Sequence, residues 1–170
     1  MVATRSFMET SYALRTVTAS ISFIASTTIA FVILQMPHGL SSSYRRILLC
    51  LSISDVIQSL SIILGPFAVP QDTPDSIWAI GNTASCTTQG FLLNIVMVAT
   101  PMYTFGLSIY FLLRVKYGMS REDFAAVVEW KWHTVTLLWN LVGNAYILFT
   151  KSINATRAGC LCTVESLPLF

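Results

Sequence analysis

A carboxylate in the middle of a long apolar stretch is the side chain best placed to do chemistry in this sequence. Asp55 is the only charged residue between Ile47 and Gln71. It lies nine residues after Arg46, which is about 13 Å at ~1.5 Å per helical residue. A carboxylate at that depth in a membrane is costly unless polar partners or water surround it. Such residues are functional candidates, although a structural contact between helices would also explain Asp55.

Hydroxyl groups on a later apolar stretch are the expected partners of Asp55. Thr100 and Thr104 are four residues apart and therefore share one face of a helix. Pro101 lies between them, removes a backbone donor and is expected to kink that helix. Neighbouring hydroxyls and waters commonly satisfy such breaks. We therefore expect Asp55 to face Thr100 or Thr104 in a small polar cavity, which could hold a cation, a proton or only water.

No other set of residues in the sequence suggests catalysis. The two histidines, His38 and His133, lie near expected membrane edges. There is no Ser-His-Asp set, Gly-rich phosphate loop or metal-binding cluster. We therefore expect no enzymatic activity, no metal and no cofactor. The net charge of +2 is too small to indicate nucleic acid as a partner.

The elements that must position Asp55 are helices that cross a membrane. Of the 170 residues, 54% are hydrophobic and only 11% are charged, whereas soluble domains carry about 25% charged residues. A helix needs about 20 mostly apolar residues to cross a hydrocarbon core of ~30 Å. We therefore expect an all-α, multi-pass protein that contacts membrane lipids through four transmembrane helices. Their expected bounds are Arg15–Met36, Arg46–Val69, Gly90–Leu113 and His133–Thr150.

Basic residues predict the orientation of these helices. Arg45 and Arg46 end the first loop, and residues 114–131 carry four more basic residues, whereas the second loop carries Asp72 and Asp75 without Lys or Arg. Because cytoplasmic loops carry the excess of Lys and Arg, we expect the first and third loops inside. The second loop and an N-terminal tail of residues 1–14 are then outside, and the plasma membrane is the expected location. The glycosylation sequon Asn154-Ala-Thr156 also falls outside.

The third loop contains a short amphipathic pattern. Ser120 precedes two acidic residues, as an N-cap does, and Phe124 and Val128 share a face. A short helix on the cytoplasmic surface is expected, either as a docking element for a cytoplasmic partner or as a plain linker. Trp130 and Trp132 lie where an aromatic belt would anchor the fourth helix.

Several short motifs, taken in order, resemble those of rhodopsin-like G-protein-coupled receptors. Leu51-Ser-Ile-Ser-Asp55 resembles the L-x-x-x-D signature of their second helix. Trp78-Ala-Ile-Gly81 followed by Cys86 is similar to the outer-loop Trp and Gly ahead of their third-helix Cys. Cys162 falls where their second outer loop supplies the matching Cys. The closest likeness is to protist receptors related to the cAMP-receptor group.

The resemblance implies that residues 15–170 form a receptor-like domain equivalent to helices one to four of a seven-helix bundle. Such a domain receives an outer ligand and signals to a heterotrimeric G protein. It also implies a Cys86–Cys162 disulfide, which leaves Cys160 either free or paired between chains. The expected ligand surface is the outer part of the third helix, although these side chains could equally serve helix packing. It comprises Gln89, Leu93, Asn94 and Met97.

Two departures from the receptor pattern limit what the chain is expected to do. The Asp-Arg-Tyr triad of that family would fall at Tyr110-Phe111-Leu112, where it is absent. The family's activation depends on its sixth helix, which these 170 residues do not supply. We therefore expect a fragment that does not activate a G protein alone. The alternative is a stand-alone four-span scaffold or small transporter.

Overall fold

Four long helices contain most of the residues that the structure describes. The computed structural model describes residues 5–73, 76, 78–150, 152–155 and 161–164. The long helices are α1 (Arg5–Gln35), α2 (Ser43–Ile63), α4 (Thr83–Lys116) and α6 (Trp130–Thr150). Three short helical pieces connect them: α3 (Gly65–Ala68), α5 (Arg121–Phe124) and the π-helical turn η1 (Ala125–Glu129). The strands β1 (Ile153–Ala155) and β2 (Cys162–Val164) pair antiparallel.

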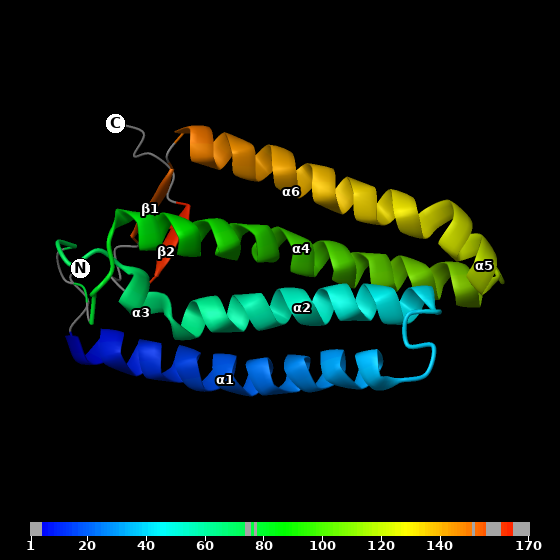
Figure 1. The fold of residues 1–170 in the computed structure, drawn as a ribbon, viewed down its shortest axis with the longest axis horizontal. Helices are drawn as coiled ribbons and strands as arrows, with labels where there is room; N and C mark the ends of the chain where they lie inside the picture. The colour runs from blue at the N-terminus through cyan, green and yellow to red at the C-terminus, as the bar shows by residue number, and fades with distance from the viewer. Residues whose placement is uncertain (1–4, 74–75, 77, 151, 156–160, 165–170) are drawn as a thin grey trace.

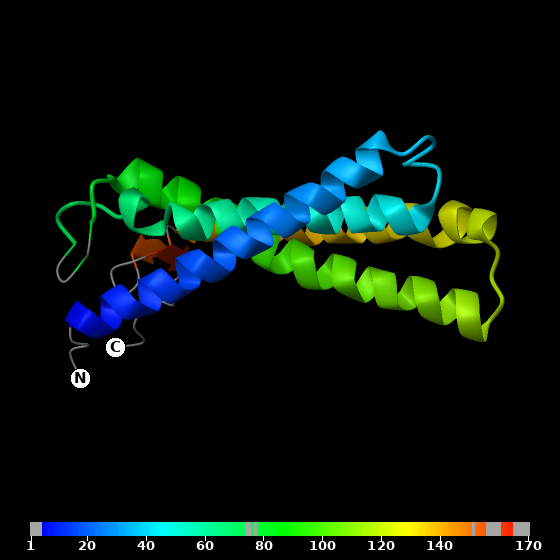
Figure 2. The same cartoon turned by 90° about the horizontal axis from the view of Figure 1, so that it is seen from below.

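The long helices lie side by side in the order α1, α2, α4, α6 (Figure 1). Successive long helices run in opposite directions, and α1 crosses α2 obliquely (Figure 2). The β1–β2 pair lies at one end of the row, which we call the hairpin end. The loop between α1 and α2 lies at the opposite end with α5, and we call this the loop end.

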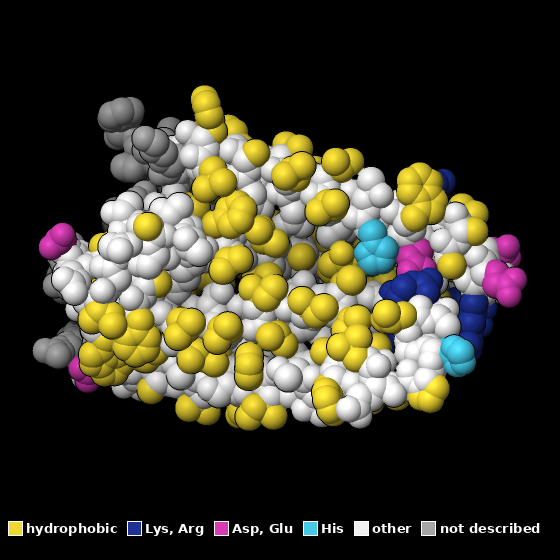
Figure 3. All heavy atoms as spheres, in the orientation of Figure 1, with side chains coloured by type: hydrophobic (Ala, Val, Ile, Leu, Met, Phe, Trp, Pro, Cys, Tyr) yellow, Lys and Arg dark blue, Asp and Glu magenta, His cyan; other side chains and the backbone are white. Residues whose placement is uncertain are grey.

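Three of these helices are long and apolar enough to cross a membrane, over Glu9–Gln35, Ser43–Ile63 and Thr83–Lys116. Large apolar side chains lie exposed along them, and Figure 3 shows these over the middle of the bundle with charged groups gathered at its ends. Such a distribution indicates a membrane protein, because a soluble surface would not expose so much contiguous apolar area. Four spans were predicted, but α6 is not among the three.

The sequence explains where the helices begin and end. α1 begins at Arg5, ten residues before its predicted start, and it continues unbroken to Gln35 because no Gly or Pro occurs until Pro37. α4 begins at a capping box, in which the Asn82 side chain accepts from the Ser85 backbone N–H and the Ser85 hydroxyl accepts from the Asn82 backbone N–H. The predicted third span therefore starts too late by seven residues. Pro101 lies inside this helix, as predicted.

Candidate functional site

A disulfide bridge holds the hairpin end of the bundle together. It joins Cys86 on α4 to Cys162 on β2, which confirms the predicted pair. Both cysteines are buried with Val69 in one small apolar cluster. Cys160 and the Thr156 of the predicted sequon lie outside the described residues. The backbone of Asn154 belongs to β1, where it is opposite Thr163.

Gln89 uses both ends of its amide to connect the elements around this bridge. Its Nε2 donates to the Ser61 carbonyl at 2.8 Å, and its Oε1 accepts from the Cys162 backbone N–H at 3.2 Å. The side chain is only 6% exposed. Gln89 therefore ties α2 and β2 to α4, and the structure does not place it on an open ligand surface.

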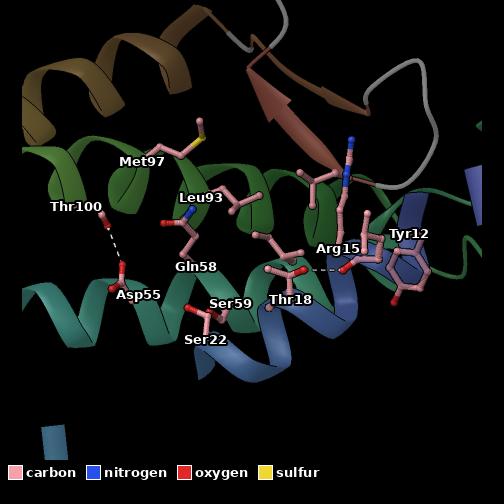
Figure 4. Close-up of a pocket in the computed structure, with 14 residues that line it drawn as sticks. Tyr12, Arg15, Thr18, Ser22, Asp55, Gln58, Ser59, Leu93, Met97 and Thr100 are labelled. Carbon is pink, nitrogen blue, oxygen red and sulfur yellow. Dashed lines mark hydrogen bonds between the residues drawn. The ribbon is translucent and has the colours of Figure 1, made fainter. Parts of the chain in front are cut away.

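A cavity of about 720 Å³ lies between α1, α2 and α4 in the hairpin half of the bundle (Figure 4). Two of the predicted ligand residues, Leu93 and Met97, line it, and so do Asp55 and Thr100. Asn94 does not line it, because its Nδ2 donates instead to Asn144 Oδ1 on α6 at 3.1 Å. The remaining lining residues are Tyr12, Leu14, Arg15, Thr18, Ala19, Ser22, Gln58, Ser59, Ile62 and Leu161.

The end of the cavity nearer the loop end of the bundle carries polar groups with few partners. Thr100 Oγ1 donates to Asp55 Oδ1 across a long 3.4 Å. Thr104, the other predicted partner, donates instead to the Thr100 carbonyl of its own helix at 2.9 Å. Gln58 points into the cavity, and its amide has no hydrogen-bond partner among the described residues (Figure 4). These groups remain available to a further polar partner.

The end of the cavity nearer the hairpin carries a cation that sequence reasoning did not assign to the site. Arg15 is exposed, and Figure 4 shows its side chain extending toward the hairpin. No described residue forms an ion pair with it. Beside it, Tyr12 donates to the Ile63 carbonyl at 2.9 Å and stacks edge-on against Trp78. The recurrence of polar residues at positions 12, 15, 18 and 22 is the signal that could have predicted this face of α1.

A second cluster of polar residues lies at the loop end, away from the cavity. Arg46 on α2 donates from Nε and Nη2 to the two carboxylate oxygens of Glu129 at 2.5 and 2.6 Å. Burial alone would raise the pKa of Glu129, but hydrogen bonds from Arg46 and Ser43 and the nearby positive charges outweigh it and lower that pKa. His133 lies 3.8 Å from the same carboxylate.

The contact between α4 and α6 is also polar. The Trp132 indole N–H donates to the Met102 carbonyl, and its ring lies directly over Gly106. Trp132 therefore packs between two helices and is not free for the predicted aromatic belt, whereas Trp130 is exposed. On α6, Thr136, Asn140 and Asn144 are buried at four-residue spacing. These polar residues lower the mean hydropathy of α6, which is not among the three helices apolar enough to cross a membrane.

Comparison with known proteins assigns the chain to no family. No protein-family model matches the chain, and no curated protein matches it.

Proposed function

We propose that this chain is the ligand-receiving part of a plasma-membrane receptor similar to rhodopsin-like G-protein-coupled receptors. The observation that supports this proposal best is the cavity between α1, α2 and α4. It is formed by three helices and contains Leu93, Met97, Asp55 and Thr100, four residues that sequence reasoning selected independently. A cavity with apolar walls and a few convergent polar groups is the usual form of a small-molecule site.

The disulfide supports α6 as a fourth span. α4 runs from Cys86 at the hairpin end to Lys116 at the loop end, and it is long and apolar enough to cross a membrane. The bridge to Cys162 requires the chain to return to the hairpin end. α6 is the long helix that makes this return, and its 21 residues extend about 32 Å at ~1.5 Å per residue. Its buried polar residues face α4, so lipid would meet Leu137, Trp139 and Phe149 instead.

The charges and the disulfide together orient the bundle. Basic residues gather at the loop end, where Arg45, Arg46, Arg114 and Lys116 lie, which favours a cytoplasmic location. Disulfides persist outside the cytosol, which favours an outer location for the hairpin end. The N-terminus and the end of the cavity that carries Arg15 are then outside, and we call this the outer end and the end at Asp55 the inner end. G-protein coupling is proposed for an assembly in which further helices supply the moving element that a two-state switch needs.

Thiol labelling tests whether the cavity receives ligands from outside. In a Cys50→Ser, Cys160→Ser background, Met97→Cys is expected to react with a membrane-impermeant thiol reagent added to intact cells. Leu137→Cys, on the lipid face of α6, is the matched control and is expected to stay unlabelled. Protection of Met97→Cys in intact cells, with labelling only after permeabilisation, would favour the four-span scaffold or transporter instead.

A further inference from the structure

We propose that the cavity binds an elongated amphipathic anion. Its acidic group pairs with Arg15 at the outer end, its apolar chain runs along the cavity, and a hydrogen-bond donor at its far end meets Gln58 and Asp55. The inference rests on the proposed function, because it names the class of ligand for the same cavity.

Arg15 selects an acidic group at the outer end. It is the only cation among the described residues that line the cavity, and it lies inside the apolar segment Glu9–Gln35. No described residue forms an ion pair with it. A guanidinium in such a segment is stabilised by an anionic partner, and a carboxylate or phosphate can accept two parallel hydrogen bonds from its fork.

The middle of the cavity suits an apolar chain. Ala19, Ile62, Leu93 and Met97 supply the walls from α1, α2 and α4. Of the Ser and Thr hydroxyls on α1 that line the cavity, that of Thr18 already donates to the Leu14 carbonyl at 2.9 Å. That of Ser22 lies beside Ser59, further along toward Gln58 and Asp55 (Figure 4). Because the Thr18 hydroxyl is engaged within its own helix, an apolar ligand chain gains more in this part of the cavity than a polar group would.

The inner end selects a hydrogen-bond donor and fixes the direction of the ligand. Asp55 has a single long hydrogen bond from Thr100, and Gln58 has none from the described residues. An acidic group beside Asp55 would be repelled, so the acid must lie toward Arg15. From Ile62 to Asp55 the cavity extends about 10 Å along α2 at ~1.5 Å per residue. A chain-like molecule covers that length, whereas a compact one reaches only one end.

A photoreactive ω-hydroxydodecanoate tests this assignment in the purified chain, reconstituted in phosphatidylcholine nanodiscs. Labelling is expected on the peptide that carries Leu93 and Met97, and free ω-hydroxydodecanoate should compete far better than its methyl ester. Arg15→Gln is expected to weaken binding about tenfold or more, since a charge-assisted hydrogen bond is lost. Arg15→Lys, which keeps the charge but not the fork, should retain part of it, and Arg45→Gln, at the loop end, should leave it unchanged.

A substitution of Gln58 tests the contact at the inner end of the cavity. Gln58→Leu is expected to weaken binding of the hydroxy acid while leaving that of plain dodecanoate unchanged, because only the hydroxyl meets the amide. Suppression of labelling by phosphatidylglycerol in the nanodisc would identify a bilayer lipid as the source of the anion. Indifference to phosphatidylglycerol, with labelling intact, would identify a free acid.

Equal competition by the acid and its ester, or labelling that does not depend on Arg15, would overturn the proposed ligand class. If Met97→Cys is still reached from outside in that case, the receiving cavity stands and only its ligand was misassigned. If Met97→Cys is protected as well, the proposed function fails with it.

Discussion

Separating Arg46 from Glu129 is expected to destabilise the loop end of the bundle by about 2 kcal/mol. Exposed ion pairs contribute about 0.2–1 kcal/mol, and breaking a fully buried pair costs about 3–5 kcal/mol. This pair lies between the two cases, since the Glu129 side chain is 8% exposed and that of Arg46 is 32% exposed. Two short charge-assisted hydrogen bonds place the expected cost of Glu129→Gln in that intermediate range.

A double-mutant cycle isolates this interaction. The free energy of unfolding is measured by SDS titration of the purified protein for Glu129→Gln, Arg46→Gln and the double variant. We expect a coupling energy of about 2 kcal/mol, because the second substitution costs little once the first has removed the partner. Arg45→Gln is the control, since Arg45 makes no contact with Glu129 that the structure describes. A coupling energy near zero would refute the reasoning that this pair fastens η1 to α2.

The same pair gives a pH dependence with a defined sign. The folded state lowers the pKa of Glu129 below its ordinary value of 4.5. The stabilisation is therefore fully present above pH 4.5 and is lost as the pH falls through the lowered folded value. The stability difference between wild type and Glu129→Gln should be constant near neutral pH and shrink only in that acidic range. A difference that already shrinks between pH 7 and 6 would assign the effect to another group.

Three further substitutions and one control test the packing of the bundle around the cavity. Gly106→Ala should lower the free energy of unfolding by about 1–3 kcal/mol in the same SDS titration, because its Cβ meets the Trp132 indole. The control is Gly143→Ala, which has open space around it and should be neutral or stabilising by up to about 1 kcal/mol. Gln89→Leu should cost about 1–3 kcal/mol, because it leaves the Cys162 N–H without its acceptor; an unchanged midpoint would contradict this. Cys86→Ser should cost about 2–5 kcal/mol, since the bridge closes a separation of 76 residues, and reduction should have no further effect on that variant.

The sequence was sufficient to predict the helical architecture and part of the site. Charge-free windows identify the long helices because a lipid environment excludes charge over a fixed length. The Asp55–Thr100 pairing was one of two options, and helix periodicity could not separate Thr100 from Thr104, since both lie on one face. Only the rotation of α4 against α2 decides that Thr100 makes the contact.

The features that the sequence did not predict depend on irregular helix geometry or on contacts between residues far apart in the chain. The π-helical turn η1 changes the period at which side chains recur, and Glu129 becomes buried although the pattern of residues 120–128 assumed a regular α-helix. The engagement of Gln89 by Ser61 and Cys162 joins residues far apart in the sequence, so its role in packing was one of two open readings. Arg15 was placed at the edge of a span because α1 was predicted to start there, whereas the helix begins at Arg5.

The sidedness of the two ends of the chain tests the central claim most directly. An epitope tag is placed at the N-terminus, a second between Ser41 and Ser42, and a third at the C-terminus, each in a separate variant expressed in cells. Four spans with the hairpin end outside predict that the N-terminal and C-terminal tags stain intact cells. The tag between Ser41 and Ser42 should then stain only after permeabilisation. N-terminal and C-terminal tags on opposite sides of the membrane would show that α6 does not cross and would contradict the proposed receptor topology.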